Sequence, residues 1–376
     1  MSKRPFPFQL PEVSKQLFIL AANPSSIESE EFDPKIITAP FVKQAVLSHL
    51  SGFVYHNLSP VKEKVDPQLW KQLELQYVQV LQGNHQFLRL HQQMAQLFEQ
   101  NQIPFAVLKG LDLLFRTYRE EGIRHISDID VLILPEDLQK VTSILETNGF
   151  KCNLQVYVSK FYEKHIPNHA PLQASLNGLN IDVHVSVLNK KSQSYFITNN
   201  LILNREKLFW DDYHTYLLEI KNSALFIILH LHKHIDHGNA IKMSSFLDVQ
   251  RTIQALDYPQ NKAQYPNQIQ TKIEYIIDCM VWLGLLEHDF LPDRKKAPAR
   301  YFFYLLFFLQ AVQPTFGQTL RYKFFPRLFL YQFSWKTLPL LFHEVFPSKR
   351  YLLYSAPNSS YLGAWIKRIQ HFTRKK

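Results

Sequence analysis

The stretch "RHISDIDVLILP" at residues 124–135 decides the fold, because it sets two aspartates into a strand-like run of apolar side chains. Side chains alternate between the two faces of a strand, so Asp128 and Asp130 share one face while Ile129 and Val131 occupy the other. Two carboxylates about 6 to 7 Å apart on one face repel each other, and each must shed water. The pair therefore favours a site in which a cation lies between the carboxylates.

Strand and helix patterns alternate on both sides of this stretch. "IPFAVLKG" predicts a short buried strand, "LDLLFRTYREEG" a helix closed by Gly122, and "PEDLQKVTSILETNG" a helix that starts at Pro135 and stops at Gly149. Further on, Asn177 and Gly178 lie between two alternating runs, which is typical of a β-hairpin. This alternation from 103 to 190 predicts an α/β or α+β core.

A third acid stands in the second strand of the predicted hairpin, "LNIDVHVSVL". Asp182, His184 and Ser186 share one face of that strand by alternation. Three carboxylates on neighbouring strands could hold divalent cations, and Mg²⁺ prefers one or two protein carboxylates together with substrate phosphates. The same motifs taken singly are more often a turn before a strand and a strand edge that meets solvent.

Composition and periodicity divide the chain into regions. Apolar residues spaced by three and four predict helices from 41 to 101, with Asp66 as N-cap and Pro67 as first helical residue, and again from Asn222 onward. The region from 291 carries 15 Lys and Arg against two acids, a local charge of +13, and is rich in aromatic residues. We therefore predict a helical N-terminal region at 1–101, a core at 102–190, a helical substrate-binding region at 200–290 and a basic aromatic C-terminal region at 291–376.

Bulk composition predicts a globular protein in the cytoplasm. The 376 residues are 46% hydrophobic, which is ample for real cores. The two cysteines, Cys152 and Cys279, are too few for a disulfide framework or a zinc cluster, which favours a reducing compartment. We expect no export signal and no membrane span, because the longest apolar run is far shorter than the about 20 residues that a bilayer requires.

The order "LKGLDLLFRTYREEGIRHISDIDVLI", a helix ending in "LETNGF", and then "IDVHVSV" resembles the nucleotidyltransferases of the DNA polymerase beta-like superfamily, and among them the uncharacterised nucleotidyltransferase family. The resemblance covers residues 103–188 firmly and extends more loosely to 290. It implies an α+β fold whose polymerase-beta-like core is a mixed sheet with flanking helices. It also implies a glycine turn that meets the triphosphate, an aspartate pair that binds two magnesium ions, and a third aspartate on a later strand.

Carried over by position, the resemblance makes Asp128 and Asp130 the aspartate pair and Asp182 the third acid, so these three would be both catalytic and metal-binding. The cofactor implied is Mg²⁺, as two ions, with Mn²⁺ as its substitute. The activity implied is transfer of a nucleoside monophosphate from an NTP such as ATP to a hydroxyl or other nucleophile on a small molecule or protein, with release of pyrophosphate.

Nucleotide binding is assigned to Lys109, Gly110, Arg124 and Ser127. Gly110 corresponds to the turn glycine, and the ammonium of Lys109 can supply a phosphate contact of its own. Arg124 would pair with the acids or bind a phosphate. It is equally consistent with an ordinary charged residue on a surface loop. Leu111 stands where many members of the superfamily carry a small residue, so we expect it to narrow the phosphate turn.

A substrate pocket is predicted from His184, His230, His234, Lys242 and Asp248. His230, His234 and His237 share one face of a helix in "HLHKHIDH", but no third ligand at a suitable spacing supports a zinc site, so packing or pocket histidines are favoured. The family tends to carry a histidine pair here, followed by an aspartate that Asp248 matches.

Two other functions stay open at this point. A non-catalytic module of the same fold would bind nucleic acid or a membrane surface through its basic aromatic tail, and a toxin-like enzyme would act on RNA or a protein with the same chemistry. The intact acids favour an enzyme, with an NTP and an unidentified acceptor as partners and nucleic acid not expected as the primary substrate. For the tail, a helical subdomain with an aromatic core is the simpler interpretation, and peripheral membrane contact is its alternative.

Overall fold

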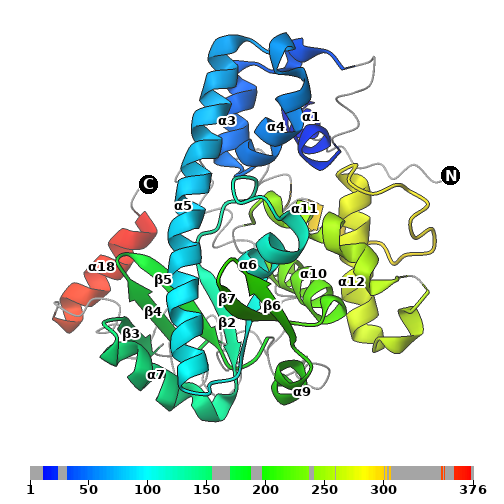
Figure 1. The fold of residues 1–376 in the computed structure, drawn as a ribbon. Helices are drawn as coiled ribbons and strands as arrows, with labels where there is room; N and C mark the ends of the chain where they lie inside the picture. Colours follow the sequence, from blue (N-terminus) through cyan, green and yellow to red (C-terminus); the bar gives the residue numbers. More distant parts are fainter. Residues whose placement is uncertain are drawn as a thin grey trace. The chain divides into compact units, whose positions relative to one another are not determined.

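The computed structural model describes residues 12–23, 32–154, 170–187, 197–236, 241–258, 260–299, 301–302, 305, 349, 351 and 360–373. The chain forms two compact units, and Figure 1 labels the elements of both. The first unit comprises residues 1–100, 106–130 and 204–312, and the second comprises residues 101–105, 131–203 and 313–376. Over the described residues, no helix has both the length and the apolar character needed to cross a membrane.

Seven strands are hydrogen-bonded in the order β3-β4-β5-β2-β1-β7-β6. The β1–β7 pair is parallel, whereas the β3–β4, β4–β5 and β6–β7 pairs are antiparallel, so the sheet is mixed. With its helices, the sheet confirms the predicted α+β class. The strands are β1 (Phe105–Leu108), β2 (Ile129–Ile133), β3 (Lys151–Leu154), β4 (Leu172–Leu176), β5 (Leu179–His184), β6 (Glu206–Trp210) and β7 (Tyr213–Leu217).

The first unit holds most of the helices. The sequence predicted two or three helices between 41 and 101, and the structure has three α-helices there, α3, α4 and α5. A further helix, α1, precedes them. The α-helices of this unit are α1 (Glu12–Ala22), α3 (Ala39–Leu47), α4 (Ser51–Leu58), α5 (Pro67–Gln100), α6 (Lys109–Leu113), α10 (Ile220–Asp236), α11 (Ser244–Thr252) and α12 (Asn267–Trp282).

Helix α5 is the long helix of this unit, and α3 and α4 pack against its N-terminal part (Figure 1). Its start confirms the predicted cap, because the Asp66 carboxylate accepts hydrogen bonds from the backbone N–H groups of Gln68 and Leu69. Its apolar stripe, which includes Met94 and Phe98, is buried. This stripe fixes α5 in the core, so polar residues on neighbouring turns of α5 are held firmly as well.

The segment between β1 and β2 differs from its prediction. Helix α6 is only five residues long, continues as one wider π-helical turn at Leu114–Tyr118, and ends at Arg119, whose φ is +54°. The predicted stop at Gly122 is therefore wrong. Gly122 serves packing instead, since a Cβ there would come within 2.2 Å of the Tyr77 ring. The residues from 119 to 128 form a loop that leads into β2.

A second hairpin, β6–β7, lies in the segment expected to be helical. Trp210 pairs with Tyr213, so the loop consists of Asp211 and Asp212, and Asp211 has φ +50°. Asp tolerates this left-handed backbone better than most residues, which makes a two-residue hairpin loop feasible. The helices predicted after Asn222 follow as α10, α11 and α12.

The second unit contains the hairpin predicted from Asn177 and Gly178. Both residues have positive φ, +54° and +83°, as a type I′ turn requires, and Leu176 pairs with Leu179 across it. Strand β5 ends at His184, so Ser186 lies beyond the strand rather than on its face. The α-helices of this unit are α7 (Leu138–Thr147), α9 (Thr198–Leu203) and α18 (Tyr361–Thr373). Most of the predicted C-terminal region, and His237, fall outside the described residues.

Candidate functional site

The loop that precedes β2 is held by one side chain of α5, Asn84. Its amide N–H₂ donates to the backbone oxygens of Glu121 and Arg124, and its carbonyl accepts from the N–H of Ile126 at 3.0 Å. Asn84 is 1% exposed. Because buried backbone groups need partners, Asn84 satisfies three of them at once and so fixes the loop just before Asp128.

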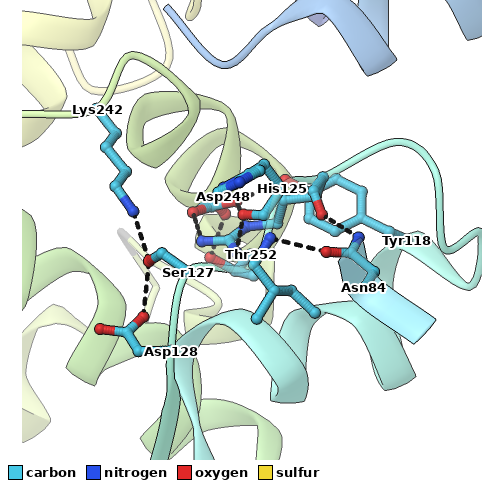
Figure 2. Close-up of polar contacts among 10 residues, drawn as sticks. Asn84, Tyr118, His125, Ser127, Asp128, Lys242, Asp248 and Thr252 are labelled. Atoms are coloured by element: carbon cyan, nitrogen blue, oxygen red, sulfur yellow. Dashed lines mark hydrogen bonds and ion pairs between the residues drawn. The ribbon is translucent and has the colours of Figure 1, made fainter. Parts of the chain in front are cut away.

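Arg124 projects from this loop onto α11. Its Nε and Nη2 atoms each donate to the Asp248 carboxylate at 2.9 Å, and the Tyr118 hydroxyl donates to the same carboxylate at 2.7 Å. Asp248 raises the pKa of the Arg124 guanidinium, against the effect of burial. Figure 2 shows Tyr118 and Asp248 beside the loop. The geometry makes this pair an anchor of the loop, and a nucleotide contact by Arg124 stays a prediction.

The Asp128 carboxylate ends a short hydrogen-bonded chain (Figure 2). The Lys242 ammonium donates to Ser127 Oγ at 2.8 Å, and the Ser127 hydroxyl donates to Asp128 Oδ1 at 2.8 Å. Desolvation lowers the pKa of Lys242, and the charge of Asp128 opposes this. Ser127 was predicted to bind the nucleotide and Lys242 to line the substrate pocket. The structure joins both to the Asp128 carboxylate through one chain of hydrogen bonds.

The Asp130 carboxylate meets a second lysine. Asp130 is 4% exposed, and its Oδ1 atom accepts from the Lys109 ammonium at 2.7 Å. Lys109 has φ +53°, a left-handed conformation that non-glycine residues seldom adopt. Strained backbone of this kind tends to persist at functional sites. Here it stands at the start of α6, where the chain turns from β1 towards the acids.

Helix α10 adds imidazole and ammonium groups around Lys109 and Asp130. The rings of His230 and His234 lie 4.4 Å apart, centroid to centroid. Burial lowers the pKa of His230, with a further contribution from Lys109, while Asp130 opposes the shift. Burial and Lys109 also lower the pKa of Lys233 to about 8. His230 is therefore neutral near pH 7, and the charge of Lys109 acts on both His230 and Lys233.

Gly110 and Leu111 differ in what surrounds them. A Cβ on Gly110 would come within 2.9 Å of Arg124 Nη1, so glycine leaves space for the guanidinium. Leu111 is 1% exposed and belongs to the core. The residue that was expected to narrow the phosphate turn thus has its side chain packed inside the unit.

Asp182 and His184 belong to the second unit, on β5. The Asp182 carboxylate accepts from the Gln173 amide at 3.0 Å, and Gln173 is its cross-strand partner on β4. His184 is buried. Within this unit β5 neighbours β2, whose residues from Val131 on directly follow Asp130. The meeting of the three acids stays a prediction.

The donor set of the two aspartates fits a divalent metal ion. Among the residues that the structure describes, no group of three or more His, Cys, Asp or Glu side chains is arranged to hold a metal. Mg²⁺ needs no such cage, since one or two carboxylates and substrate phosphates suffice. The Asp130 carboxylate already binds one cation, the Lys109 ammonium 2.7 Å from its Oδ1 atom, and this ammonium would have to move for a metal ion to bind the same oxygen. The histidines of α10 form no zinc cluster with other described residues.

Three residues at this loop, His49, Asn84 and His125, were not predicted from the sequence. The rings of His49 and His125 lie 4.9 Å apart at an interplanar angle of 33°. His125 stands three residues before Asp128, which was a signal, but nothing in the sequence pointed to His49 or to Asn84.

Comparison with known protein families gives one match. The model of a family described as "Uncharacterised nucleotidyltransferase" matches residues 36–285, well over half of the chain. The matched range includes the loop, both aspartates, Asp182 and α10. Comparison with curated proteins gives no match.

Proposed function

Because the chain belongs to the uncharacterised nucleotidyltransferase family, we propose that it transfers a nucleoside monophosphate from an NTP to a hydroxyl or other nucleophile and releases pyrophosphate. The observation that carries the proposal is the environment of the aspartate pair. Asp128 and Asp130 stand where β2 begins, and each has a lysine ammonium nearby, Lys242 through Ser127 and Lys109 directly. This arrangement suits a ligand that brings both phosphates and a metal ion.

Asp128 and Asp130 would hold Mg²⁺, with Asp182 as the third acid by resemblance to the superfamily. The support for Asp182 is that its strand neighbours the strand that follows Asp130. When bound, Mg²⁺ would neutralise the charge that develops on the leaving pyrophosphate. Asp182 would take up the proton of the attacking hydroxyl.

Lys109 would exchange partners when the nucleotide binds. In the structure its ammonium neutralises the buried Asp130 carboxylate. A triphosphate offers several oxygens of higher charge density, so the flexible side chain would transfer its hydrogen bond to a phosphate. Lys233 would join it, because a phosphate restores the charge that burial disfavours in that lysine. His230, which is neutral, can donate one hydrogen bond to the same group.

The acceptor is proposed as a hydroxyl on a small molecule or a protein. Nothing described here favours nucleic acid as acceptor, and the tail that would bind a polyanion or membrane lies mostly outside the described residues. A non-catalytic module is the weaker proposal, because such a module has no need of two acids paired with two lysines.

The test is release of pyrophosphate from ATP, GTP, CTP and UTP in the presence of Mg²⁺. Wild-type protein should release pyrophosphate from at least one of them, and a double variant, Asp128→Asn with Asp130→Asn, should lose at least about 10³-fold in rate, as expected for groups that act in the transition state. Asp289→Asn, an exposed aspartate of the same unit, is the matched control and should keep the wild-type rate. Equal rates in the wild type and the double variant would refute the assignment.

A further inference from the structure

Two histidines from distant parts of the first unit form a pair of rings beside the aspartate loop. His49 lies in the turn between α3 and α4, and His125 lies in the loop before Asp128. Their ring centroids are 4.9 Å apart and their planes are tilted by 33° to each other. His49 is exposed and His125 is half-buried, so the pair offers a flat surface that solvent can reach.

The backbone of His49 is unfavourable for a histidine. It has φ +58° and occupies the position after the C-cap of α3, where the N–H of Leu50 bonds to Ala45 O and the N–H of His49 to Val46 O. This is the Schellman motif, in which glycine is the usual residue at that position because it has no Cβ. Within the described residues the His49 side chain forms no hydrogen bond. The imidazole therefore has a cost to folding, and the contact that it gains is the one with the His125 ring.

The two rings are neutral near pH 7 and are not fully satisfied. Burial, and then His49, Lys242 and Arg124, lower the pKa of His125 to about 4. Burial and Lys242 lower the pKa of His49 as well. The Nδ1 atom of His125 is buried and has no hydrogen-bond partner among the described residues. Neutral aromatic rings suit a planar heterocycle better than a phosphate.

The ring pair lies among the charged side chains of the aspartate loop. Lys242, which reaches Asp128 through Ser127, acts on both rings, and the charge of Asp128 acts on His125. The second cluster of cations, around Lys109, acts on Asp130 instead. If the polyphosphate lies at Lys109, the nucleoside must extend from the aspartates in another direction. The ring pair provides an aromatic surface on the same loop, three residues before Asp128.

We propose that the exposed face of the His49–His125 pair is the surface on which the base of the NTP stacks. This inference rests on the proposed function and adds the residues that recognise the nucleoside. Stacking of a base on an aromatic side chain is tolerant of base identity, so the surface would accept more than one NTP. Lys242, beside the rings, would face the α-phosphate or the ribose.

The experiment compares two ligands that share a polyphosphate and differ in the nucleoside. Isothermal titration in Mg²⁺ measures the affinity of wild type, His49→Gly and His49→Ala for inorganic tripolyphosphate and for the tightest-binding of the four NTPs. Because a stacked base is worth about 1–3 kcal/mol, both variants should bind the NTP at least about fivefold more weakly. Their affinity for tripolyphosphate should stay within twofold of wild type.

Thermal melts by circular dichroism control for folding, and His49→Gly should melt at or above the wild-type temperature. Unchanged NTP affinity in both variants would overturn the inference, and so would an equal loss for NTP and tripolyphosphate, which indicates a general disturbance of the site. If wild type binds neither ligand, the proposed function fails first, and the inference fails with it.

Discussion

Substitution of Asp248 by Asn tests whether the Arg124–Asp248 pair anchors the loop that carries the aspartates. Asp248 accepts three hydrogen bonds, two from Arg124 and one from Tyr118, and is 3% exposed. Asparagine keeps the shape of the side chain and removes its charge. The Arg124 guanidinium, whose side chain is 12% exposed, is then left in the unit without a counter-charge.

The expected loss follows from the burial of both partners. Removing one partner of a buried ion pair costs about 3–5 kcal/mol, most of it from the uncompensated charge that remains. We expect Asp248→Asn to lower the free energy of unfolding by about 3 kcal/mol, the lower end of this range. Arg124 keeps some contact with solvent, and the Asn oxygen can still accept one hydrogen bond. That is a large share of a typical free energy of unfolding of about 5–15 kcal/mol. The double variant Arg124→Met with Asp248→Leu should recover most of it.

Urea unfolding followed by circular dichroism measures the effect, with Asp289→Asn as the matched exposed control, which should change the free energy of unfolding by no more than about 0.5 kcal/mol. An Asp248→Asn protein as stable as wild type would refute the anchoring role. Arg124 would then be free to serve the nucleotide, and the same variant should change NTP affinity instead.

Three further predictions concern the first unit. His49→Gly should raise the free energy of unfolding by about 1 kcal/mol, because it relieves the left-handed backbone, while His49→Ala should not, and urea midpoints of the two variants compare them directly. Asn84→Ala should lower the free energy of unfolding by about 3 kcal/mol, because three backbone groups lose their partner at about 1 kcal/mol each. The variant should also speed tryptic cleavage of the loop. Unchanged cleavage would contradict the role of Asn84. Burial lowers the pKa of His91 from 6.5 to about 3, so on acidification the unfolded chain binds a proton at His91 before the folded chain does. The wild type should therefore lose more stability between pH 7 and pH 4 than His91→Gln. Parallel profiles of stability against pH would contradict this.

Local signals in the sequence predicted the local structure well. Some features depend only on residues that are neighbours in the chain, so their patterns could be interpreted directly. They are the Asp66 cap, the Asn177–Gly178 turn, and the strands β1 and β2. The hairpin β6–β7 was missed although its strands alternate, because Asp211 and Asp212 are weaker turn formers than an Asn-Gly pair. Gly122 was mistaken for a helix stop because the reason for it, the Tyr77 ring, comes from a distant helix.

The site could be predicted only where its residues lie in one motif. The aspartate pair and Ser127 lie together in the sequence, and Lys109 and Gly110 stand together at the end of the preceding strand. The family resemblance pointed to Asp182, whose part in the site stays a prediction. Contacts between distant positions could not be predicted, since nothing in a single sequence shows which buried polar groups will meet. Asn84, which holds the loop, and His49, which covers His125, are of this kind.

Binding of Mn²⁺ with a nucleotide tests most directly the central claim, that Asp128 and Asp130 hold a divalent ion for the NTP. Electron paramagnetic resonance counts bound Mn²⁺ in the presence of a non-hydrolysable NTP analogue. The wild type and Asp289→Asn should bind Mn²⁺ only together with the analogue, and Asp130→Asn should lose at least about tenfold in affinity. If Asp130→Asn bound Mn²⁺ and the analogue as tightly as wild type, the aspartate pair would not be the metal site.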